Sequence, residues 1–353
     1  MMGKSNELNL DNRTFVDKKL GELKEGYNED KKVLVRFLSK DHSKKEYSVT
    51  GVKDTESTNN WKAWLYLAPV LILMSVFLIY PLIDTIFISF LDNFDYIKGT
   101  FDGFTIDNYL AILGIAARNG AYEYKVVRYA LPNTFIIVFF TVPISIVIAL
   151  LISVGLNSIK WFQKILQTIF FLPYVTNVIA VGMVFSVIFD ANGVINYIFG
   201  LDGMKWIYGA DRWVAMVPLC IYIIWSSLPF KILVFLSGLQ GIDKQYYQAA
   251  KVDASSKAKI LRRITIPLLG PQILYIMVTS FIGAFKEYSS VVGLFNGPGT
   301  TTGTYELYTV VYYIYDNLNT NTSLAAAAAV MLFVIILIFT AFQMIISKKR
   351  VYY

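Results

Sequence analysis

The chain has 353 residues, of which 56% are hydrophobic and 16% are charged, and its formal net charge is +7. Soluble domains contain about 45–50% apolar and about 25% charged residues, so this chain lacks the charge needed to cover a water-exposed surface. The same composition excludes an intrinsically disordered protein, and the single cysteine, Cys220, excludes a disulfide scaffold. Cys220 lies in an apolar run, where we expect a buried and inert thiol.

The N-terminal segment differs from the rest of the chain. Residues 1–60 carry 12 Lys and Arg and 11 Asp and Glu, with no long apolar stretch. We expect a cytosolic extension that is partly disordered. The alternative is that residues 31–38 form a short amphipathic element on the membrane surface or on a partner.

Six apolar segments follow within residues 61–353, which we assign to one membrane domain. A bilayer core of about 30 Å requires about 20 helical residues, and each segment is long enough. Strands are not expected, because the runs are continuously apolar. The sequence therefore predicts an all-α polytopic membrane protein with six transmembrane helices. They cover residues 63–90, 130–153, 165–189, 214–239, 267–287 and 324–347.

The connecting segments differ in charge. Residues 1–62, 154–164, 240–266 and 348–353 hold 24 Lys and Arg together, whereas the alternate loops, 91–129, 190–213 and 288–323, hold 6. Basic connections stay in the cytosol. Both termini are therefore predicted to be cytoplasmic, in a multi-pass protein of a prokaryotic cell membrane.

Two further segments carry structural predictions. The outer loop 91–129 is long and rich in aromatic residues, so we expect it to be partly folded and to meet an external partner. The sixth apolar segment opens with five alanines at 325–329. Small side chains let helices approach closely in lipid, so we expect tight packing there.

Residues for common catalytic chemistry are few. The only histidine, His42, lies in the polar N-terminal segment, and no G-x-x-x-x-G-K-[ST] phosphate loop occurs. Zinc sites and His-based triads are therefore not expected, and any ATP would be bound by another chain. The charged residues of the spans, Asp84, Lys231, Lys286 and Glu287, are functional candidates. Snorkelling is the alternative explanation for the two lysines.

The fourth connection, residues 240–267, is the most informative segment. It is basic and helix-forming, it carries small residues at Ala249, Ala250 and Ala254, and it ends at Pro267. These features predict a short cytosolic helix that fits a groove of another protein and passes motion into the membrane. The alternative is an ordinary basic loop held by anionic lipid.

The spacing in this segment resembles the coupling loop of permease subunits of binding-protein-dependent ABC importers. That loop reads E-A-A, three residues, G, nine residues and I-x-L-P. Here Gln248-Ala249-Ala250 is followed at the same spacing by Ala254 and by Ile264-Thr265-Ile266-Pro267. Asp253 matches the acid usual in the sugar-importer branch. Gln248 replaces the glutamate of the pattern, and Ala254 replaces its glycine.

The resemblance covers residues 60–353. Tyr80-Pro81-Leu82 is similar to the first span of sugar permeases, and Asn296-Gly297-Pro298 to the loop after their fifth span. The basic tail 348–353 is similar to that of the maltose-type first permease of a pair. The resemblance implies the type I ABC importer permease fold with a cytosolic coupling helix.

The resemblance also implies a function and a set of partner proteins. The chain would form half of the translocation pathway for a mono- or oligosaccharide, beside a second homologous permease. Two separate ATPase subunits would bind ATP and Mg, and an extracellular solute-binding lipoprotein would deliver cargo. No cofactor, metal or nucleic acid is expected in the chain, which is not itself an enzyme. The alternatives are another cargo, such as a glycerol phosphate or a peptide-like solute, and a channel or secondary transporter.

The resemblance also assigns site residues by position. The substrate-pathway asparagines of maltose-type permeases are not retained here, which suggests a substrate other than maltose. The alternative is that the matched side chains only pack helices together. The ATPase-coupling residues are Gln248, Ala249, Ala250, Asp253, Ala254, Ile264 and Pro267. The substrate-pathway residues are Trp225, Ser227, Phe230, Ser280, Gly283, Ala284 and Glu287.

Overall fold

The computed structural model describes residues 60–118, 121–122, 124–159, 163–201, 203–299 and 306–348. The chain divides into two compact units, 1–68 and 69–353. The extension predicted over residues 1–60 lies outside the described residues except for the last of them. The description below concerns the larger unit and the helix that leads into it.

Four helical stretches of the described residues are long and apolar enough to cross a membrane. They match the first, second, fourth and sixth predicted spans, and they are Ala63–Ser89, Val126–Ser158, Arg212–Gly241 and Thr322–Ser347. The first comprises α2 (Asn60–Met74), a π-helical turn η1 (Ser75–Ile79) and α3 (Tyr80–Ser89). The others consist of η2 (Val126–Ala130) with α5 (Leu131–Ser158), α9 (Arg212–Gly241) and α16 (Thr322–Lys348).

The third predicted span, 165–189, is not one continuous helix. It is divided into α6 (Gln163–Val175) and α7 (Val178–Ile188). Asn177 has an extended backbone, and its side chain accepts hydrogen bonds from the N–H groups of Ile179 (2.9 Å) and Ala180 (3.4 Å). This is an N-cap, which begins a new helix where the apolar pattern predicted a continuous one.

The fifth predicted span, 267–287, is also altered. α11 (Lys257–Ile260), η3 (Leu261–Thr265) and α12 (Ile266–Leu268) form one stretch, and α13 (Gly270–Phe285) leaves it at 70°. The bend lies at Leu269, and the proline in the first turn of α13 is Pro271. Pro267 lies in the first turn of α12, just before the bend. If the bent pair is one span, the described residues contain five.

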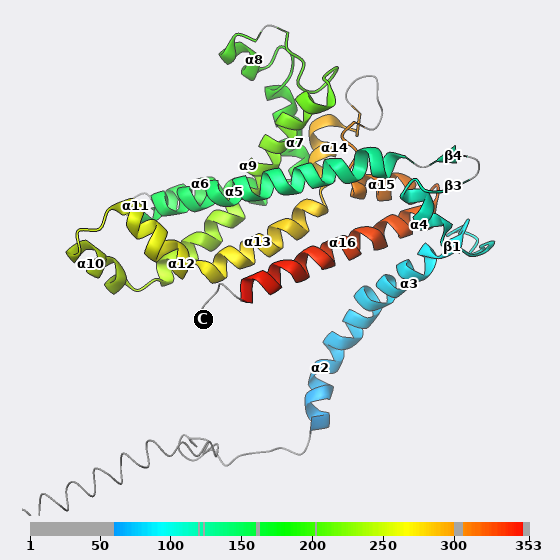
Figure 1. Ribbon diagram of the computed structural model, residues 1–353, viewed down its shortest axis with the longest axis horizontal. Helices are drawn as coiled ribbons and strands as arrows, with labels where there is room; N and C mark the ends of the chain where they lie inside the picture. Colours follow the sequence, from blue (N-terminus) through cyan, green and yellow to red (C-terminus); the bar gives the residue numbers. More distant parts are fainter. Residues whose placement is uncertain are drawn as a thin grey trace, which may run out of the picture. The chain divides into compact units, whose positions relative to one another are not determined.

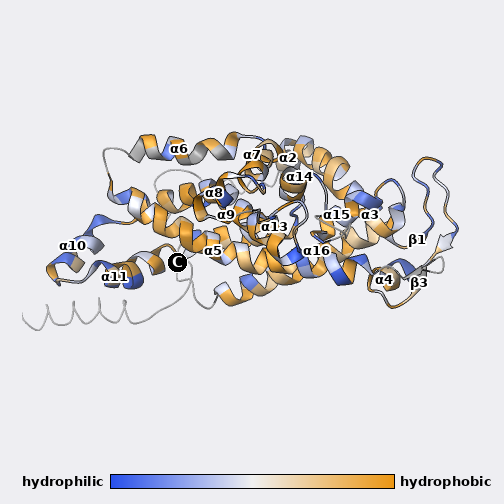
Figure 2. Ribbon diagram, turned by 90° about the horizontal axis from the view of Figure 1, so that it is seen from above, coloured by the Kyte–Doolittle hydropathy of each residue, from blue (hydrophilic) through white to orange (hydrophobic). Residues whose placement is uncertain are grey.

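The long helices pack along one another. α5 packs against α9 and α13, and α16 packs against α3, α13 and α15 (Val310–Asn317) (Figure 1). Their residues are hydrophobic along most of their length, whereas hydrophilic residues gather in the connecting segments (Figure 2). In α16, Ala325, Ala327 and Ala328 are at most 1% exposed. The tight packing predicted for the alanine run is therefore confirmed.

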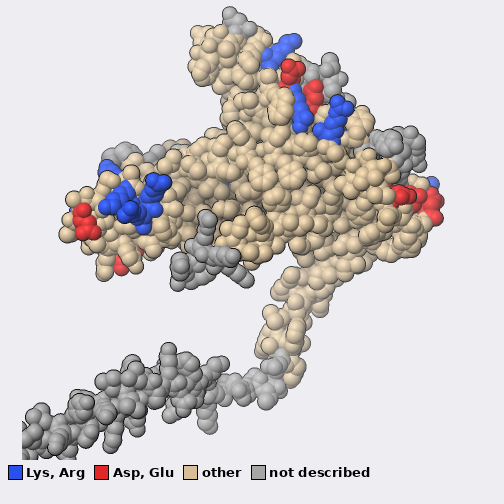
Figure 3. Space-filling view, in the orientation of Figure 1, with Lys and Arg blue, Asp and Glu red and all other residues tan. Residues whose placement is uncertain are grey.

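The two ends of this helix bundle carry different structures. At one end lie α10 (Lys244–Val252), α11 and α12, where Lys and Arg gather (Figures 1 and 3). At the other lie two hairpins, β1 (Leu91–Asp92) with β2 (Gly103–Phe104) and β3 (Ala117–Arg118) with β4 (Ala121–Tyr122), and α4 (Asp107–Ile112). The first hairpin pairs Leu91 with Phe104 in antiparallel register. The prediction of a partly folded loop 91–129 is confirmed.

A third group of short helices stands beside α9. α14 (Ser289–Phe295) packs against α7, and α8 (Val194–Phe199) follows α7. Gly182 and Gly293 meet where α7 and α14 cross: a Cβ on Gly182 would stand 2.7 Å from the carbonyl carbon of Gly293. Two glycines therefore set the close approach of these backbones. Cys220, on α9, is buried as expected.

One buried amide connects three separate segments. Asn133, on α5, donates to the carbonyl oxygens of Glu306 (2.9 Å) and Tyr308 (2.8 Å). Its Oδ1 accepts from Nε of Arg212, the first residue of α9, at 2.9 Å. Thr134 Oγ1, on the next residue, accepts from the N–H of Val310 at 3.1 Å. These bonds fix the segment before α15 against the starts of α5 and α9.

Candidate functional site

A cavity of about 320 Å³, called here the central cavity, lies where α5, α6, α9 and α13 meet. The volume falls within the range of about 300–1,000 Å³ typical of ligand pockets. Its lining combines aromatic rings, hydroxyl groups and two charged side chains. The residues are Thr141, Val142, Tyr174, Ile223, Ser226, Ser227, Phe230, Lys231, Thr279, Ser280, Gly283, Ala284 and Glu287.

Aromatic rings form one side of the central cavity. Tyr174 of α6 and Phe230 of α9 are stacked, with ring centroids 6.1 Å apart and planes 18° apart. The ring of Tyr275 on α13, which does not line the cavity, has its centroid 6.3 Å from that of Phe230, with an angle of 52° between the planes. A proline, Pro229, precedes Phe230 within α9. Three helices thus contribute to one aromatic row, and such rings are suited to contact the apolar face of a ligand.

Lys231 supplies a cation to the same cavity. The residue is 4% exposed, and its Nζ donates to Oγ of Ser145 on α5 (2.6 Å) and of Ser227 one turn earlier on α9 (2.8 Å). A snorkelling lysine would extend its ammonium to the membrane edge. This side chain lies between two packed helices, so snorkelling does not explain it.

Glu287 supplies a carboxylate just after α13. Its Oε1 accepts from the backbone N–H of Ser290 in the first turn of α14, at 2.9 Å. Its backbone carbonyl accepts from the hydroxyl of Thr309 at 2.8 Å. The N–H groups of a first helical turn have no intrahelical partners, so the carboxylate caps α14. This end of the cavity is therefore connected to α14 and α15.

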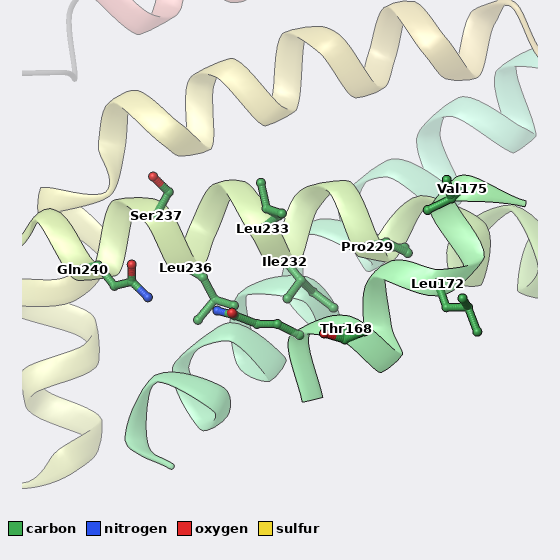
Figure 4. Close-up of a pocket in the computed structure, with 10 residues that line it drawn as sticks. Thr168, Leu172, Val175, Pro229, Ile232, Leu233, Leu236, Ser237 and Gln240 are labelled. Carbon is green, nitrogen blue, oxygen red and sulfur yellow. The ribbon is translucent and has the colours of Figure 1, made fainter. Parts of the chain in front are cut away.

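A second, larger cavity lies between α6 and α9 (Figure 4) and measures about 500 Å³. Leu172, Val175, Leu233 and Leu236 line much of it, and Gln240 and Ser237 lie toward one end. None of the predicted site residues lines this cavity. Despite its size, its apolar walls suit lipid or a packed helix better than a polar cargo.

The segment predicted to contain the coupling helix does contain a short helix, α10. Asp243 caps its start by accepting from the N–H of Gln245 at 2.9 Å. At its end, the N–H of Ser255 bonds to the carbonyl of Ala250 and that of Ala254 to the carbonyl of Lys251, each at 3.0 Å. This pair of bonds is a Schellman motif, in which the residue after the cap is left-handed. That residue is Ala254, with φ of +51°.

A side-chain contact joins this helix to the following segment. The hydroxyl of Tyr247 lies 3.3 Å from Oγ1 of Thr265 in η3. Outward, α10 presents apolar side chains to solvent: Val252 is 87% exposed and Tyr246 54%. An exposed apolar face rimmed by polar residues is typical of a protein contact.

The comparison with known families decides the identity of this architecture. Residues 145–352 match the model described as "Binding-protein-dependent transport system inner membrane component". The chain belongs to this family. It is accordingly a multi-pass permease of a transport system, and the resemblance inferred from the residue spacing is confirmed.

Individual relatives agree with this membership. The lactose transport system permease protein LacF of Rhizobium radiobacter is 31% identical over 69% of this chain and 80% of its own length. The sn-glycerol-3-phosphate transport system permease protein UgpA of Brucella abortus is 28% identical over 82% of this chain and 96% of its own. Among solved structures, a bacterial ABC transporter that imports the acidic polysaccharide alginate aligns with a TM-score of 0.65 and 22% identity. That alignment covers 82% of this chain and 96% of the solved chain, and it shows the type I importer fold.

In this permease the structure brings most predicted pathway residues together. Ser227, Phe230, Ser280, Gly283, Ala284 and Glu287 all line the central cavity, although they come from two helices and a loop. Trp225 does not line it, and its ring contacts that of Phe185 on α7 instead, at 5.0 Å.

Other lining residues were not assigned to the pathway. Lys231 was predicted as a functional candidate because it is a charge within a span, and it is four residues from Ser227, so the two share a helix face. Tyr174, on α6, carried no such signal in the sequence. The lining residues that were not assigned to the pathway are Thr141, Val142, Tyr174, Ile223, Ser226, Lys231 and Thr279.

The seven predicted coupling residues lie in one segment but in different settings. Gln248, Ala249, Asp253, Ala254 and Pro267 are exposed, and Ile264 is half-buried. Ala250 is 5% exposed and is therefore covered by this chain itself. An alanine already buried within the loop is not available to a partner, so Ala249 is the better candidate for a docked small side chain.

Proposed function

We propose that this permease forms one half of the pathway by which an ATP-driven importer takes up a carbohydrate. It would pair with a second homologous permease and with two ATPase subunits, which would hold ATP and Mg. An extracellular solute-binding lipoprotein would deliver the cargo. The chain would contribute no cofactor site and no catalytic residue of its own.

The composition of the central cavity carries the proposal about the cargo. Stacked Tyr174 and Phe230 line the same cavity as the hydroxyl groups of Ser226, Ser227 and Ser280. A sugar has apolar ring faces and a rim of hydroxyl groups, so rings and short polar side chains recognise it together. The lactose permease relative supports this choice.

Glycerol phosphate is the second candidate, because a permease named for sn-glycerol 3-phosphate is also a relative. A phosphate carries up to two charges and is commonly bound by several basic groups. The lining of the central cavity contains one cationic residue, Lys231, and one carboxylate residue, Glu287. This balance favours a sugar.

We base the proposed orientation of the protein in the membrane on the distribution of its basic residues. The end with α10 to α12 would face the cytosol, and the end with the β-hairpins would face outward. Basic side chains on α11 and η3 support this orientation: Lys257, Lys259, Arg262 and Arg263. We propose six spans, with α6 and α7 together forming the third, and both termini in the cytoplasm. The ATPase would meet the exposed side of α10.

Import by the reconstituted complex tests the proposal. The permease pair, the ATPase and the binding protein are placed in liposomes, and uptake of radiolabelled oligosaccharides and of glycerol 3-phosphate is measured. We expect ATP-dependent uptake of at least one oligosaccharide, and a loss of about tenfold in Phe230→Ala with normal assembly. Phe333→Ala is the matched control, since Phe333 is 44% exposed on α16, away from the cavity. Uptake of glycerol 3-phosphate alone would contradict the carbohydrate assignment.

A further inference from the structure

Lys231 is a buried cation whose described partners are all neutral. Its ammonium donates to the hydroxyl groups of Ser145 and Ser227, and the residue is 4% exposed. Within the described part of the chain, the one ion pair joins Lys98 to Asp95 in the first hairpin. Lys231 therefore has no described carboxylate as an ion-pair partner.

The carboxylate of the same cavity has a different partner. Glu287 accepts the N–H of Ser290 at 2.9 Å and caps α14. Its negative charge is thus stabilised by the start of a helix. The two charged residues come from different elements, and the described partners of the lysine are two neutral hydroxyl groups.

The ammonium group retains capacity for a ligand. It has three N–H donors, of which two are used by the serines. Burying a charge without a counterion is costly, and an anion that approaches the ammonium offsets that cost. Because Lys231 lines the central cavity, that anion can come from the cargo.

We propose that Lys231 binds a carboxylate of the cargo, so that this permease selects an acidic sugar. The inference rests on the proposed carbohydrate function and specifies its substrate class. The serines orient the ammonium, Phe230 and Tyr174 contact the ring face, and the hydroxyl side chains bind the remaining sugar hydroxyls. One cation suits one carboxylate, and the carboxylate of Glu287 disfavours a cargo of higher negative charge.

Binding to the detergent-purified importer, without its binding protein, tests this selection. The probes are galacturonosyl-galactose, a disaccharide with one carboxylate, and the neutral galactobiose of the same linkage, and calorimetry gives each Kd. We expect the acidic sugar to bind about ten- to a hundredfold more tightly, as a charge-assisted hydrogen bond implies. In Lys231→Gln the two affinities should agree within about twofold, because glutamine keeps hydrogen bonds to the serines and loses the charge.

Two controls separate charge from packing. Ser153→Ala removes another polar contact between α5 and α9, the bond from its hydroxyl to the carbonyl of Ile232 at 3.2 Å. It should keep the preference for the acidic sugar. The methyl ester of galacturonosyl-galactose tests the wild-type protein directly, and it should bind like the neutral disaccharide even if the Lys231 variant does not assemble.

The results also distinguish this inference from the proposed function. Equal wild-type affinity for the acidic sugar, its ester and the neutral disaccharide would overturn the role of Lys231 while leaving carbohydrate import intact. A preference that survives in Lys231→Gln would do the same. If neither disaccharide binds and glycerol 3-phosphate does, the carbohydrate function is wrong and the inference fails with it.

Discussion

Ala254 differs from the other non-glycine residues that have a positive φ. Among the described residues these are Asn93, Ala254 and Asn296. Asparagine tolerates the left-handed region, whereas the Cβ of alanine meets the following carbonyl oxygen there. The coupling pattern of the family has glycine at this position. The loop therefore retains the backbone of the pattern and carries the strain of an alanine.

Replacing Ala254 with glycine should relieve this strain. We expect the loop to gain about 1 kcal/mol, the cost of a left-handed alanine. Protection of the Ser255 amide, which bonds to Ala250, should then rise about fivefold in hydrogen exchange. The β-branched Ala254→Val should lower protection and transport. Equal protection in wild type and Ala254→Gly would contradict the strained Schellman ending.

Glu287→Gln tests whether its charge matters beyond the cap it forms. Glutamine can still accept the N–H of Ser290 through its amide oxygen. We therefore expect normal assembly, normal stability and a changed order of preference among the imported sugars. Glu306→Gln is the matched control, because it changes the same residue type outside the cavity lining. An unchanged order of preference would remove Glu287 from the specificity determinants.

At the scale of elements, α10 contains neighbouring alanines in different environments. Ala249 is exposed, whereas Ala250 is 5% exposed within the chain. Ala249→Glu should leave α10 folded and weaken ATPase binding about tenfold or more, because a charge must be desolvated in the groove. Pull-down of the ATPase and cargo-stimulated hydrolysis measure this loss.

Ala250→Glu should act by another route. Its carboxylate would be forced into the packing of the loop itself, so α10 should lose its structure along with its partner. Limited proteolysis of the loop should therefore be faster in Ala250→Glu and unchanged in Ala249→Glu. Wild-type hydrolysis in Ala249→Glu would exclude a tight groove around this face.

The crossing of α7 and α14 offers a second prediction about elements. A Cβ on Gly182 would meet the backbone of Gly293 at 2.7 Å, and backbone cannot turn aside as a flexible side chain can. We expect Gly182→Ala to destabilise the permease by about 1–3 kcal/mol, the usual cost of overpacking. Gly155→Ala on α5 is the control, since no atom lies within 4 Å of its added Cβ. Thermal unfolding of the two purified complexes compares them.

How far the sequence predicts these elements depends on the kind of signal. Continuous apolar runs predicted the helices of α3, α5, α9 and α16, because burial in lipid dominates their composition. The break at Asn177 was missed, because the apolar run 165–189 predicts one continuous helix. A single capping residue divides such a run only when α6 and α7 each pack against other parts of the fold. Most of the pathway residues that line the cavity were assigned by their positions in a resemblance to a family. Lys231 was a candidate only as a charge within a span, and Tyr174 was missed, because helix packing rather than local sequence brings these two side chains to the cavity.

At the scale of the whole molecule, labelling from outside tests the proposed orientation. Cys220 is buried, which leaves a low background for introduced cysteines. Thr100→Cys, in the first hairpin, should react with an impermeant maleimide in intact cells, and Ser158→Cys, at the end of α5, should react only after lysis. Both positions are exposed. Reaction of Ser158→Cys in intact cells would invert the topology.

The buried amide of Asn133 also sets an order of events during biosynthesis. Its acceptor at Glu306 is 173 residues further along the chain. At about 5–20 residues per second, a ribosome needs about 9–35 s to reach that acceptor after Asn133 has been made. During this time helix α5 lies in the translocon or in lipid, and the side-chain amide of Asn133 must bond to water or to other transient partners. The contacts between α5, α9 and the segment before α15 can close only when translation is nearly complete.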